Sequence, residues 1–343
     1  MWRPTINDPT IPLGSVILVT GVNGLVASNV ADQLLAAGYR VRGTVRNKHK
    51  SAWLASVLSA RHGSQHFELV EVPDVGKLGA WSSPVSGVSG VAHVIGAVNT
   101  RPQDIDQAFE DEMPWQISLL EACMAESSVK SFVFTSSAFA AWSPDASKKV
   151  KLTEWDWNET AIALARSNPS HMNGLTSWMA LKTMLEKCIW EWVSCRKLPF
   201  TFNSILLDTV IGHCLHPREQ GIPSTTGMVK WAYDGINLDL LALMQPQWCI
   251  DTRDAALLYI ATLVTPRVSG ERLFGFGARY SWPKVVENLR RLYPGKDLPT
   301  LNDNGWDQTD VPNKRSEELL RRVKLDGWAT LEESVQAAVV CFV

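Results

Sequence analysis

The fold of this chain is decided by one short stretch, which reads Val16-Ile17-Leu18-Val19-Thr20-Gly21-Val22-Asn23-Gly24-Leu25-Val26-Ala27. Its first five residues favour a β-strand, and the glycines and the last alanine give the spacing G-x-x-G-x-x-A. A strand, such a loop and then a helix are typical of a site that binds a dinucleotide. Gly21 lets the chain turn sharply, Gly24 lets the backbone approach a pyrophosphate, and Ala27 lets the helix lie close to the strand.

The start of the helix after this loop is also suited to phosphate. Its first backbone N–H groups have no partner within the helix, and the helix dipole adds a partial positive charge. The alternative is a strand, turn and helix that hold no ligand. We favour the binding site and expect cofactor contacts at Gly21, Asn23, Gly24, Leu25 and Val26.

The segment after the next strand, predicted over Arg40–Val45, indicates which dinucleotide binds. A free ribose 2′-hydroxyl is usually held by an acidic residue about 20 positions after the glycine loop. Here residues 44–50 are basic and include no carboxylate. Because Arg46 can pair with a 2′-phosphate, we predict NADP(H), with a solvated basic turn as the alternative.

The composition is typical of an intracellular protein. With 343 residues, of which 45% are hydrophobic, the chain can bury a large core. Its net charge of −2 gives no attraction to nucleic acid or to an anionic membrane. The six cysteines lack C-x-x-C spacing, and no apolar run approaches the ~18 residues that span a bilayer. We expect a cytoplasmic monomer or homodimer with reduced thiols and no nucleic-acid or membrane partner.

The fifteen tryptophans are the most unusual feature of the composition. We expect some of them to line an apolar cavity, which favours a hydrophobic or aromatic small molecule as substrate. By contrast, the metal-like residue types of His213–His216 lie close together without a second pair of ligands. Such spacing rarely makes a closed zinc site, so no metal is predicted.

Strands and helices alternate through the first part of the chain, which predicts a parallel, doubly wound sheet of the Rossmann type. Ligands of such sheets bind at the carboxyl ends of the strands. Asp74 and Val75 follow one predicted strand, and Asp74 is placed to accept from an adenine amino group. The strand predicted over 91–97 has small residues at its end, so we expect Ile95 and Gly96 beside the nicotinamide ribose.

The alternation loosens after a strand predicted over Phe200–Leu207. We therefore predict a Rossmann domain over residues 1–207. The remaining residues, 208–343, are expected to form mainly a smaller α+β lobe that binds substrate, with some segments returning to the first domain. Earlier in the chain, the helix predicted over 103–126 is expected to be interrupted by Pro114.

Several segments together resemble the extended short-chain dehydrogenases/reductases, and within them the fungal and yeast aldehyde/ketone reductases, which are related to plant dihydroflavonol reductases. The resemblance covers nearly the whole chain. Besides the glycine loop, it rests on Gly38–Arg46, Phe132–Ser137, Asp251–Ala256 and Leu292–Pro294. It implies NADP(H) as cofactor and a lineage of carbonyl reductases in small-molecule metabolism, including secondary metabolism.

In this family a serine, a tyrosine and a lysine carry out the reduction, with the tyrosine and lysine spaced Y-x-x-x-K on one helix. The serine holds the substrate carbonyl, and the tyrosine donates a proton. The lysine binds the nicotinamide ribose and lowers the pKa of the tyrosine. The resemblance places Ser137 in the role of the serine and Lys182 in that of the lysine. Trp178 occupies the position of the tyrosine.

This replacement limits what the resemblance implies. Trp178 and Lys182 are four residues apart, so they share one helix face. An indole N–H can donate a hydrogen bond but does not release its proton at neutral pH. Trp178 can therefore shape the catalytic centre by stacking or hydrogen bonding, but it cannot be the acid. General acid catalysis contributes typically 10²–10⁴-fold to the rate, so loss of the acid without a substitute leaves a slow reductase.

Two further departures lie near the expected cofactor. Leu207 and Asp208 stand where the family usually has a proline beside the nicotinamide, so Leu207 is expected to contact the cofactor. Pro114 and Trp115 stand in a helix that normally passes the cofactor with small residues. The residues expected to contact substrate are Ser137, Phe139, Trp178 and Asp208.

Three functions remain open at this point. The first is NADPH-dependent reduction of an aldehyde or ketone, with water or another residue supplying the proton. The second is a non-redox reaction on the same scaffold, namely cyclisation, isomerisation or dehydration of a hydrophobic intermediate, with Ser137 or Asp208 polarising the substrate. The third is a nucleotide-binding sensor without turnover. The intact glycine loop favours all three equally. The altered residues Trp178, Leu207 and Trp115 favour the second and third functions, whereas family frequency favours the reductase.

Overall fold

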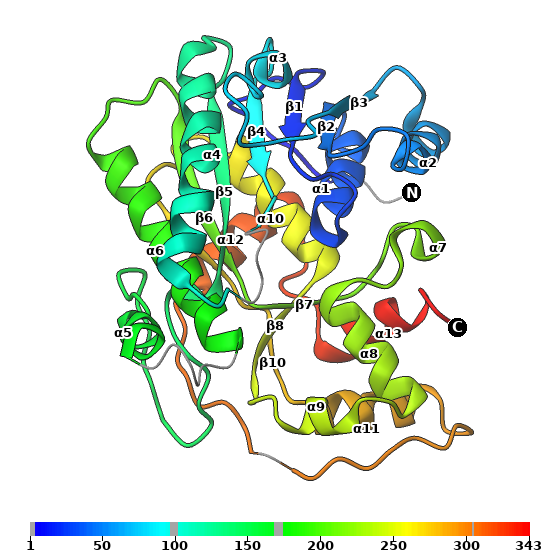
Figure 1. Ribbon diagram of the computed structural model, residues 1–343. Helices are drawn as coiled ribbons and strands as arrows, with labels where there is room; N and C mark the ends of the chain where they lie inside the picture. The colour runs from blue at the N-terminus through cyan, green and yellow to red at the C-terminus, as the bar shows by residue number, and fades with distance from the viewer. Residues whose placement is uncertain (1–3, 97–101, 168–173, 304) are drawn as a thin grey trace.

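A parallel sheet of seven strands runs through the molecule in the order β3-β2-β1-β4-β5-β6-β9 (Figure 1). The computed structural model describes residues 4–96, 102–167, 174–303 and 305–343. The order extends in opposite directions from β1 and β4, which confirms the doubly wound topology. The strands are β1 (Val16–Val19), β2 (Arg40–Val45), β3 (Phe67–Glu71), β4 (Gly90–His93), β5 (Ser131–Ser137), β6 (Thr201–Leu207) and β9 (Arg272–Gly275).

Helices cover both faces of this sheet, so its strands can be apolar along most of their length. Against one face pack α3 (Ser82–Val85), α4 (Ile105–Ala125) and α6 (Gly174–Ser194). Against the other pack α1 (Leu25–Ala36), α10 (Thr252–Val264) and α12 (Lys314–Val323). Two further helices lie outside these, α2 (Ala52–His62) beside α1 and α5 (Glu159–Ser167) on α6.

The predicted interruption at Pro114 is wrong. One helix, α4, continues from Ile105 to Ala125 with this proline inside it. A proline removes one backbone hydrogen bond and crowds the preceding turn. However, α4 buries apolar side chains that include Leu119 and Leu120 against the sheet and α6. Tertiary packing therefore outweighs the local cost.

After Leu207 the chain leaves the main sheet and builds a second, smaller layer, seen in the lower right part of Figure 1. Its sheet is mixed, because β7 is parallel and β10 antiparallel to β8. An apolar core joins this sheet to α8, α11 and α13. The elements are β7 (Thr209–Ile211), β8 (Gln247–Asp251), β10 (Ala278–Tyr280), α7 (Pro217–Gln220), α8 (Ser224–Asp234), α9 (Leu238–Ala242), α11 (Trp282–Leu292) and α13 (Leu331–Val339).

Three elements from this half of the chain return to the main sheet. The edge strand β9 pairs with β6, and α10 packs across β4 and β5. The hydroxyl of Tyr259 on α10 is hydrogen-bonded to that of Thr135 on β5. Because α12 packs in turn on α10, the main sheet and its helical layer are complete only with residues from beyond position 207.

A buried carboxylate connects α6 to three strands of the sheet. Glu186 accepts hydrogen bonds from Ser136 Oγ on β5 and from Ser204 Oγ on β6, both at 2.7 Å. It also forms an ion pair with Arg272 on β9, with Nη2 and Oε2 3.0 Å apart. The two side chains are 0% and 6% exposed, so the pair is shielded from water. Removal of either side chain would therefore leave the other buried without its ion-pair partner.

We expect Arg272→Met to lower the free energy of unfolding by about 3–5 kcal/mol, because it leaves the Glu186 carboxylate buried without its cation. Urea unfolding followed by tryptophan fluorescence measures the change. The matched control is Arg315→Met, which breaks an exposed pair with Glu271 and should cost less than about 1 kcal/mol. Equal losses of unfolding free energy in the two variants would show that the buried pair stabilises the fold no more than the exposed pair does.

Candidate active site

The loop between β1 and α1 has the shape that a pyrophosphate requires. Gly21 has a φ of +62°, and a Cβ there would lie 2.7 Å from Cγ1 of Ile95. Gly24 is the N-cap of α1; no described side chain caps this helix, and its first turn contains no acidic residue. The first amides of α1 and its dipole are therefore available to an anion. The loop fits the pyrophosphate of a dinucleotide.

A side chain from the second half of the chain holds this loop in place. Gln220, at the end of α7, donates through Nε2 to the carbonyl oxygens of Asn23 (3.1 Å) and Gly24 (3.4 Å) and to Ser28 Oγ (3.0 Å). These contacts use carbonyl and hydroxyl oxygens, so they leave the loop amides to a ligand. No sequence pattern indicates Gln220, because 196 residues separate it from Gly24.

The basic turn after β2 is exposed where the adenosine end of a dinucleotide is expected. Arg46 lies on the surface and forms no ion pair with a described residue. The carboxylate of Glu71, at the end of the neighbouring β3, accepts from the backbone N–H of Lys48 at 2.6 Å. Reasoning from the sequence missed this acidic residue, because the pairing of β2 with β3 brings it into a turn whose own residues include no acid.

Asp74 and Val75 follow β3 at the same edge of the sheet. Asp74 is exposed, and one of its carboxylate oxygens accepts from the backbone N–H of Gly76 at 2.9 Å. The side chain of Val75 is half-buried against the core on the α4 face. This turn is therefore held by its own aspartate, whose second oxygen is left to face solvent or a ligand.

The carboxyl ends of β1 and β4 are joined by the buried hydroxyl of Thr20. It accepts from the N–H of Ile95 at 3.2 Å and lies 2.9 Å from Nδ1 of His93. Burial lowers the pKa of His93 to about 4, so the ring is neutral and its Nδ1 accepts from the hydroxyl.

Strand β4 ends at His93 and not at Ala97, as predicted from the sequence; Ala97 lies outside the described residues. No described heavy atom lies within 4 Å of where a Cβ on Gly96 would stand, which leaves room for a ribose.

The ends of β5 and β6 lie side by side, because the strand register pairs Ser137 with Leu207. The half-buried Ser137 caps the short 3₁₀ helix Ala138–Ala140, with its Oγ accepting from the N–H of Phe139 at 3.3 Å. Its hydroxyl hydrogen is therefore left to donate to another group. Leu207 is buried in the core on the α10 face and presents an apolar side chain beside it.

Lys182 carries a buried ammonium group on α6. The residue is 4% exposed, and its Nζ donates to the carbonyl oxygen of Thr135 on β5 at 3.4 Å. Burial lowers the pKa of Lys182, while the carboxylates of Glu186 and Glu112 act in the opposite direction. Reasoning from the sequence missed Glu112, which α4 brings to the buried lysine across the α4–α6 contact.

Trp178 stands one helical turn before the lysine, at the same end of α6. The centre of its ring lies 5.7 Å from Nζ of Lys182, and that of Phe134 lies 5.9 Å from the same atom. Trp178 itself is half-buried against the core between the sheet, α4 and α6. A cation over an aromatic face is attracted to it. The indole therefore stabilises the ammonium group without offering an acidic proton.

Asp208 is buried directly after β6, at the junction of the two layers. Its Oδ1 accepts from the backbone N–H of Thr209 at 2.6 Å. Burial raises the pKa of Asp208 to about 8, and the negative charge of Asp307 acts in the same direction. The side chain therefore holds a proton at neutral pH. No sequence pattern connects these two aspartates, because a whole sheet and several helices separate them along the chain.

The aromatic residues near the expected substrate site lie in separate places. Phe139 packs with α5 and α6. Trp142 is buried in a cluster with Ala138 and Leu206, next to the end of β5. Trp155 is 78% exposed and faces a groove on another side of the molecule. Of these three, Phe139 and Trp142 are close in the chain to the serine.

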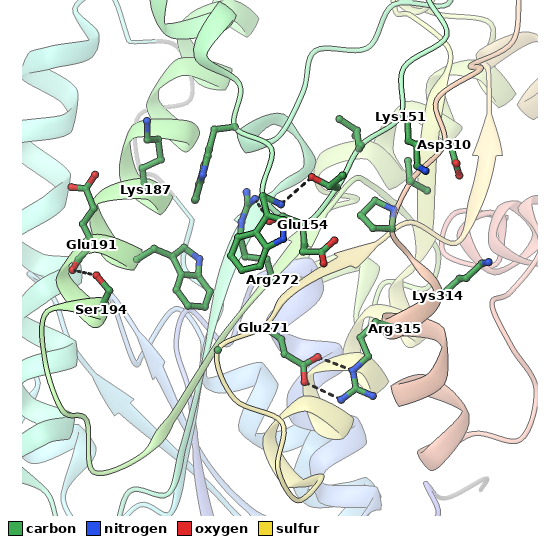
Figure 2. A pocket seen from close by; sticks show the side chains of 18 residues that line it. Lys151, Glu154, Lys187, Glu191, Ser194, Glu271, Arg272, Asp310, Lys314 and Arg315 are labelled. Atoms are coloured by element: carbon green, nitrogen blue, oxygen red, sulfur yellow. Dashed lines mark hydrogen bonds and ion pairs between the residues drawn. The ribbon is translucent and has the colours of Figure 1, made fainter.

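The groove, lined by Trp155, Trp157 and Trp190, has a volume of about 930 Å³. Figure 2 shows α6 with Lys187 on one side of it and Arg315 of α12 on the other. The walls come from residues 151–157 and 310–315, from the second half of α6 and from the start of β9, away from the carboxyl ends of the strands. The serine, lysine and Asp208 of the candidate active site are not among its lining residues. The groove is therefore separate from that site.

Three further observations concern metals, thiols and membranes. Within the described ranges, no group of three or more His, Cys, Asp or Glu side chains is arranged to hold a metal ion. All six cysteines are free thiols. None of the helices that the structure describes combines the length and apolar character needed to cross a bilayer.

The fold and site define a class: a dinucleotide-binding α/β protein with a serine and a buried lysine at the carboxyl ends of its strands. Comparison with known proteins agrees. Residues 17–160 match the model of the NAD-dependent epimerase/dehydratase family. The chain is 34% identical to aldehyde reductase 2 of Sporidiobolus salmonicolor over 97% of its length and 98% of that protein. It is 33% identical to ketoreductase adrE of Penicillium rubens, over 96% and 97%.

The chain therefore belongs to the NAD-dependent epimerase/dehydratase family, the extended short-chain dehydrogenases/reductases, and the predicted resemblance is confirmed. Solved structures agree on the fold. Gre2 of Candida albicans in complex with NADPH superposes with a TM-score of 0.79 at 21% identity, over 96% of this chain and 98% of that one. Vestitone reductase from alfalfa gives 0.75 at 19% identity, over 95% and 97%.

Proposed function

We propose that this protein is an NADP(H)-dependent reductase of aldehydes or ketones, acting on a hydrophobic or aromatic small molecule. The observation that carries the proposal is the juxtaposition of Ser137, at the end of β5, with the glycine loop and the buried Lys182 at the same edge of the sheet. It is supported by two relatives that match this chain along nearly their full length and are named aldehyde reductase and ketoreductase.

The cofactor is held by groups that the fold already positions. The amides of the glycine loop and of the first turn of α1 bind the pyrophosphate, and Arg46 binds the 2′-phosphate. Lys182 would hold the nicotinamide ribose, and Leu207 would offer an apolar contact to the nicotinamide ring. When bound, the reduced dinucleotide supplies a hydride to a carbonyl carbon. The NADPH complex of Gre2 supports this choice of cofactor.

The substrate lies between the end of β5 and the smaller layer. The hydroxyl of Ser137 donates a hydrogen bond to the carbonyl oxygen, which stabilises the negative charge that develops there. Trp178 and Phe139 supply apolar walls, and residues 208–343 contribute mainly to substrate binding. This division gives the second layer the role of selecting the substrate, while the main sheet holds the cofactor.

One observation favours a second function, a non-redox reaction such as isomerisation, cyclisation or dehydration. Trp178 occupies the position where a reductase of this family has its acidic tyrosine. An indole there extends the apolar wall and cannot protonate an alkoxide. Full-length similarity to terH of Aspergillus terreus, named an NAD-dependent epimerase/dehydratase, is compatible with this alternative at 34% identity. A sensor that binds the dinucleotide without turnover is the third possibility.

We expect Arg46→Ala to weaken NADPH binding about 10-fold or more while leaving NADH binding nearly unchanged, because a charge-assisted contact to the 2′-phosphate is lost. Quenching of tryptophan fluorescence by each dinucleotide measures both affinities. The matched control is Arg40→Ala at the other end of the same strand, where both affinities should remain those of the wild type. Equal binding of NADPH and NADH by the wild type would contradict the assignment.

We expect Lys182→Met to reduce kcat/KM for NADPH-dependent aldehyde reduction on the order of 10²-fold, because the charge beside the reacting groups is lost. The decrease in NADPH absorbance with aromatic aldehydes measures the rate. Lys187→Met, at a half-buried position farther along the same helix and outside the candidate active site, is the control and should keep the wild-type rate. A wild type that binds NADPH but reduces no carbonyl would favour the non-redox or sensor function instead.

A further inference from the structure

A segment of the smaller layer, residues 212–221, lies against the start of α1, and we call it the strap. It contains α7 and lies between β7 and α8 in the chain (Figure 1). Asn29 of α1 donates through Nδ2 to the carbonyl oxygen of His213 at 3.1 Å. The ring of Trp53, in the first turn of α2, lies 5.4 Å from that of His216. The strap is therefore fixed against the two helices that follow the first two strands of the main sheet.

The side chain of Gln220 is oriented by the strap itself. Its Oε1 accepts from the backbone N–H of His216 at 2.9 Å and from the thiol of Cys214 at 3.2 Å. The backbone N–H of Cys214 donates in turn to Sγ of Cys341, just after α13, at 3.0 Å. Both cysteines pack with Leu25, the first residue of α1. Because the amide oxygen of Gln220 faces donors, its NH₂ group points away from them, toward the glycine loop.

The NH₂ group of Gln220 reaches two peptides of the glycine loop. Its contacts are with the carbonyl oxygens of Asn23 at 3.1 Å and of Gly24 at 3.4 Å. A trans peptide is planar, so its N–H points opposite to its C=O. The carbonyl of Gly24 shares a peptide with the N–H of Leu25, which is one of the N–H groups that have no partner within α1. Gln220 therefore holds the carbonyl on its own side and directs this N–H to the other side, where a pyrophosphate would bind.

The glycine loop has few other contacts that could fix these carbonyl groups. Among the described side chains, only that of Gln220 donates to a carbonyl oxygen of residues 21–24. The third contact of its Nε2 is with Oγ of Ser28, at 3.0 Å, so the same group also holds the start of α1. Glycine adopts many backbone conformations, and a loop with two glycines has several to choose from. The hydrogen bonds of Gln220 favour one of them.

We propose that Gln220 is a positioning residue of the dinucleotide site, which holds the glycine loop ready for the pyrophosphate before the dinucleotide binds. This inference rests on the cofactor site of the proposed function. A loop that must be ordered during binding lowers the affinity, and a loop that is already ordered does not. Through Gln220, the half of the chain that forms the smaller layer also takes part in holding the cofactor.

The pyrophosphate is common to NADPH and NADH, so the effect of Gln220 should be the same for both dinucleotides. We expect Gln220→Ala and Gln220→Glu each to weaken both affinities about 10-fold, because two hydrogen bonds to the loop are lost. The ratio of the two affinities should remain that of the wild type, whereas Arg46→Ala changes it. Quenching of tryptophan fluorescence measures each affinity. Adenosine 2′-monophosphate, which has no pyrophosphate, should bind to the variants as to the wild type.

The two variants separate positioning of the loop from support of the strap. The carboxylate of Gln220→Glu can still accept from the N–H of His216, but it cannot donate to the glycine loop. A residue that only supported the strap would therefore keep its function in Gln220→Glu. The matched control is Gln308→Ala, which removes an exposed donor to the carbonyl oxygen of Ala146 and should bind both dinucleotides as the wild type does.

Hydrogen exchange of the protein without ligand, followed by mass spectrometry, gives a readout that needs neither binding nor catalysis. Exchange in residues 21–30 should be faster in both Gln220 variants than in the wild type. Unchanged exchange in the strands of the main sheet would show that the variants are folded. Wild-type affinities and wild-type exchange in Gln220→Glu would overturn this inference alone. A wild type that binds neither dinucleotide would overturn the proposed cofactor site, and this inference with it.

Discussion

The docking of α6 onto the sheet through two buried charged side chains is the constraint on which the rest of the structure depends. Glu186 reaches β5, β6 and β9 at once through two serines and Arg272. One turn earlier, Lys182 reaches the backbone of β5. Charges so deeply buried are tolerated only with close partners. The helix can therefore lie in few positions, and Trp178 is carried to the strand ends with it.

This arrangement explains how the family scaffold persists although one catalytic position has changed. The glycine loop depends on backbone conformation and on Gln220, and neither involves α6. The lysine keeps its place through its own contact with β5. The contacts that hold the glycine loop and Lys182 therefore do not involve the side chain at position 178 through a hydrogen bond. The chain then enters the smaller layer at the same edge of the sheet through a buried aspartate, Asp208.

Sequence patterns correctly predicted those features of the fold that depend on residues close together in the chain. The glycine spacing, the strand Arg40–Val45 and the i, i+4 relation of Trp178 and Lys182 involve residues close in the chain, and the α/β fold follows from their alternation. Contacts between distant segments carry no such signal. Gln220 on the glycine loop, Asp307 beside Asp208 and Glu71 in the basic turn each required the tertiary fold. Pro114 was misjudged because local cost was weighed without the burial of α4.

The central claim is that hydride transfer still occurs at a site whose tyrosine is replaced. NADPH carrying deuterium at the transferable position of the nicotinamide ring tests it most directly, with the wild-type protein and a panel of aromatic aldehydes. Mass spectrometry of the products would then show whether the label has moved. We expect alcohols with one deuterium on the carbinol carbon. Tight binding of the labelled dinucleotide, with no deuterium in any product, would contradict the reductase assignment.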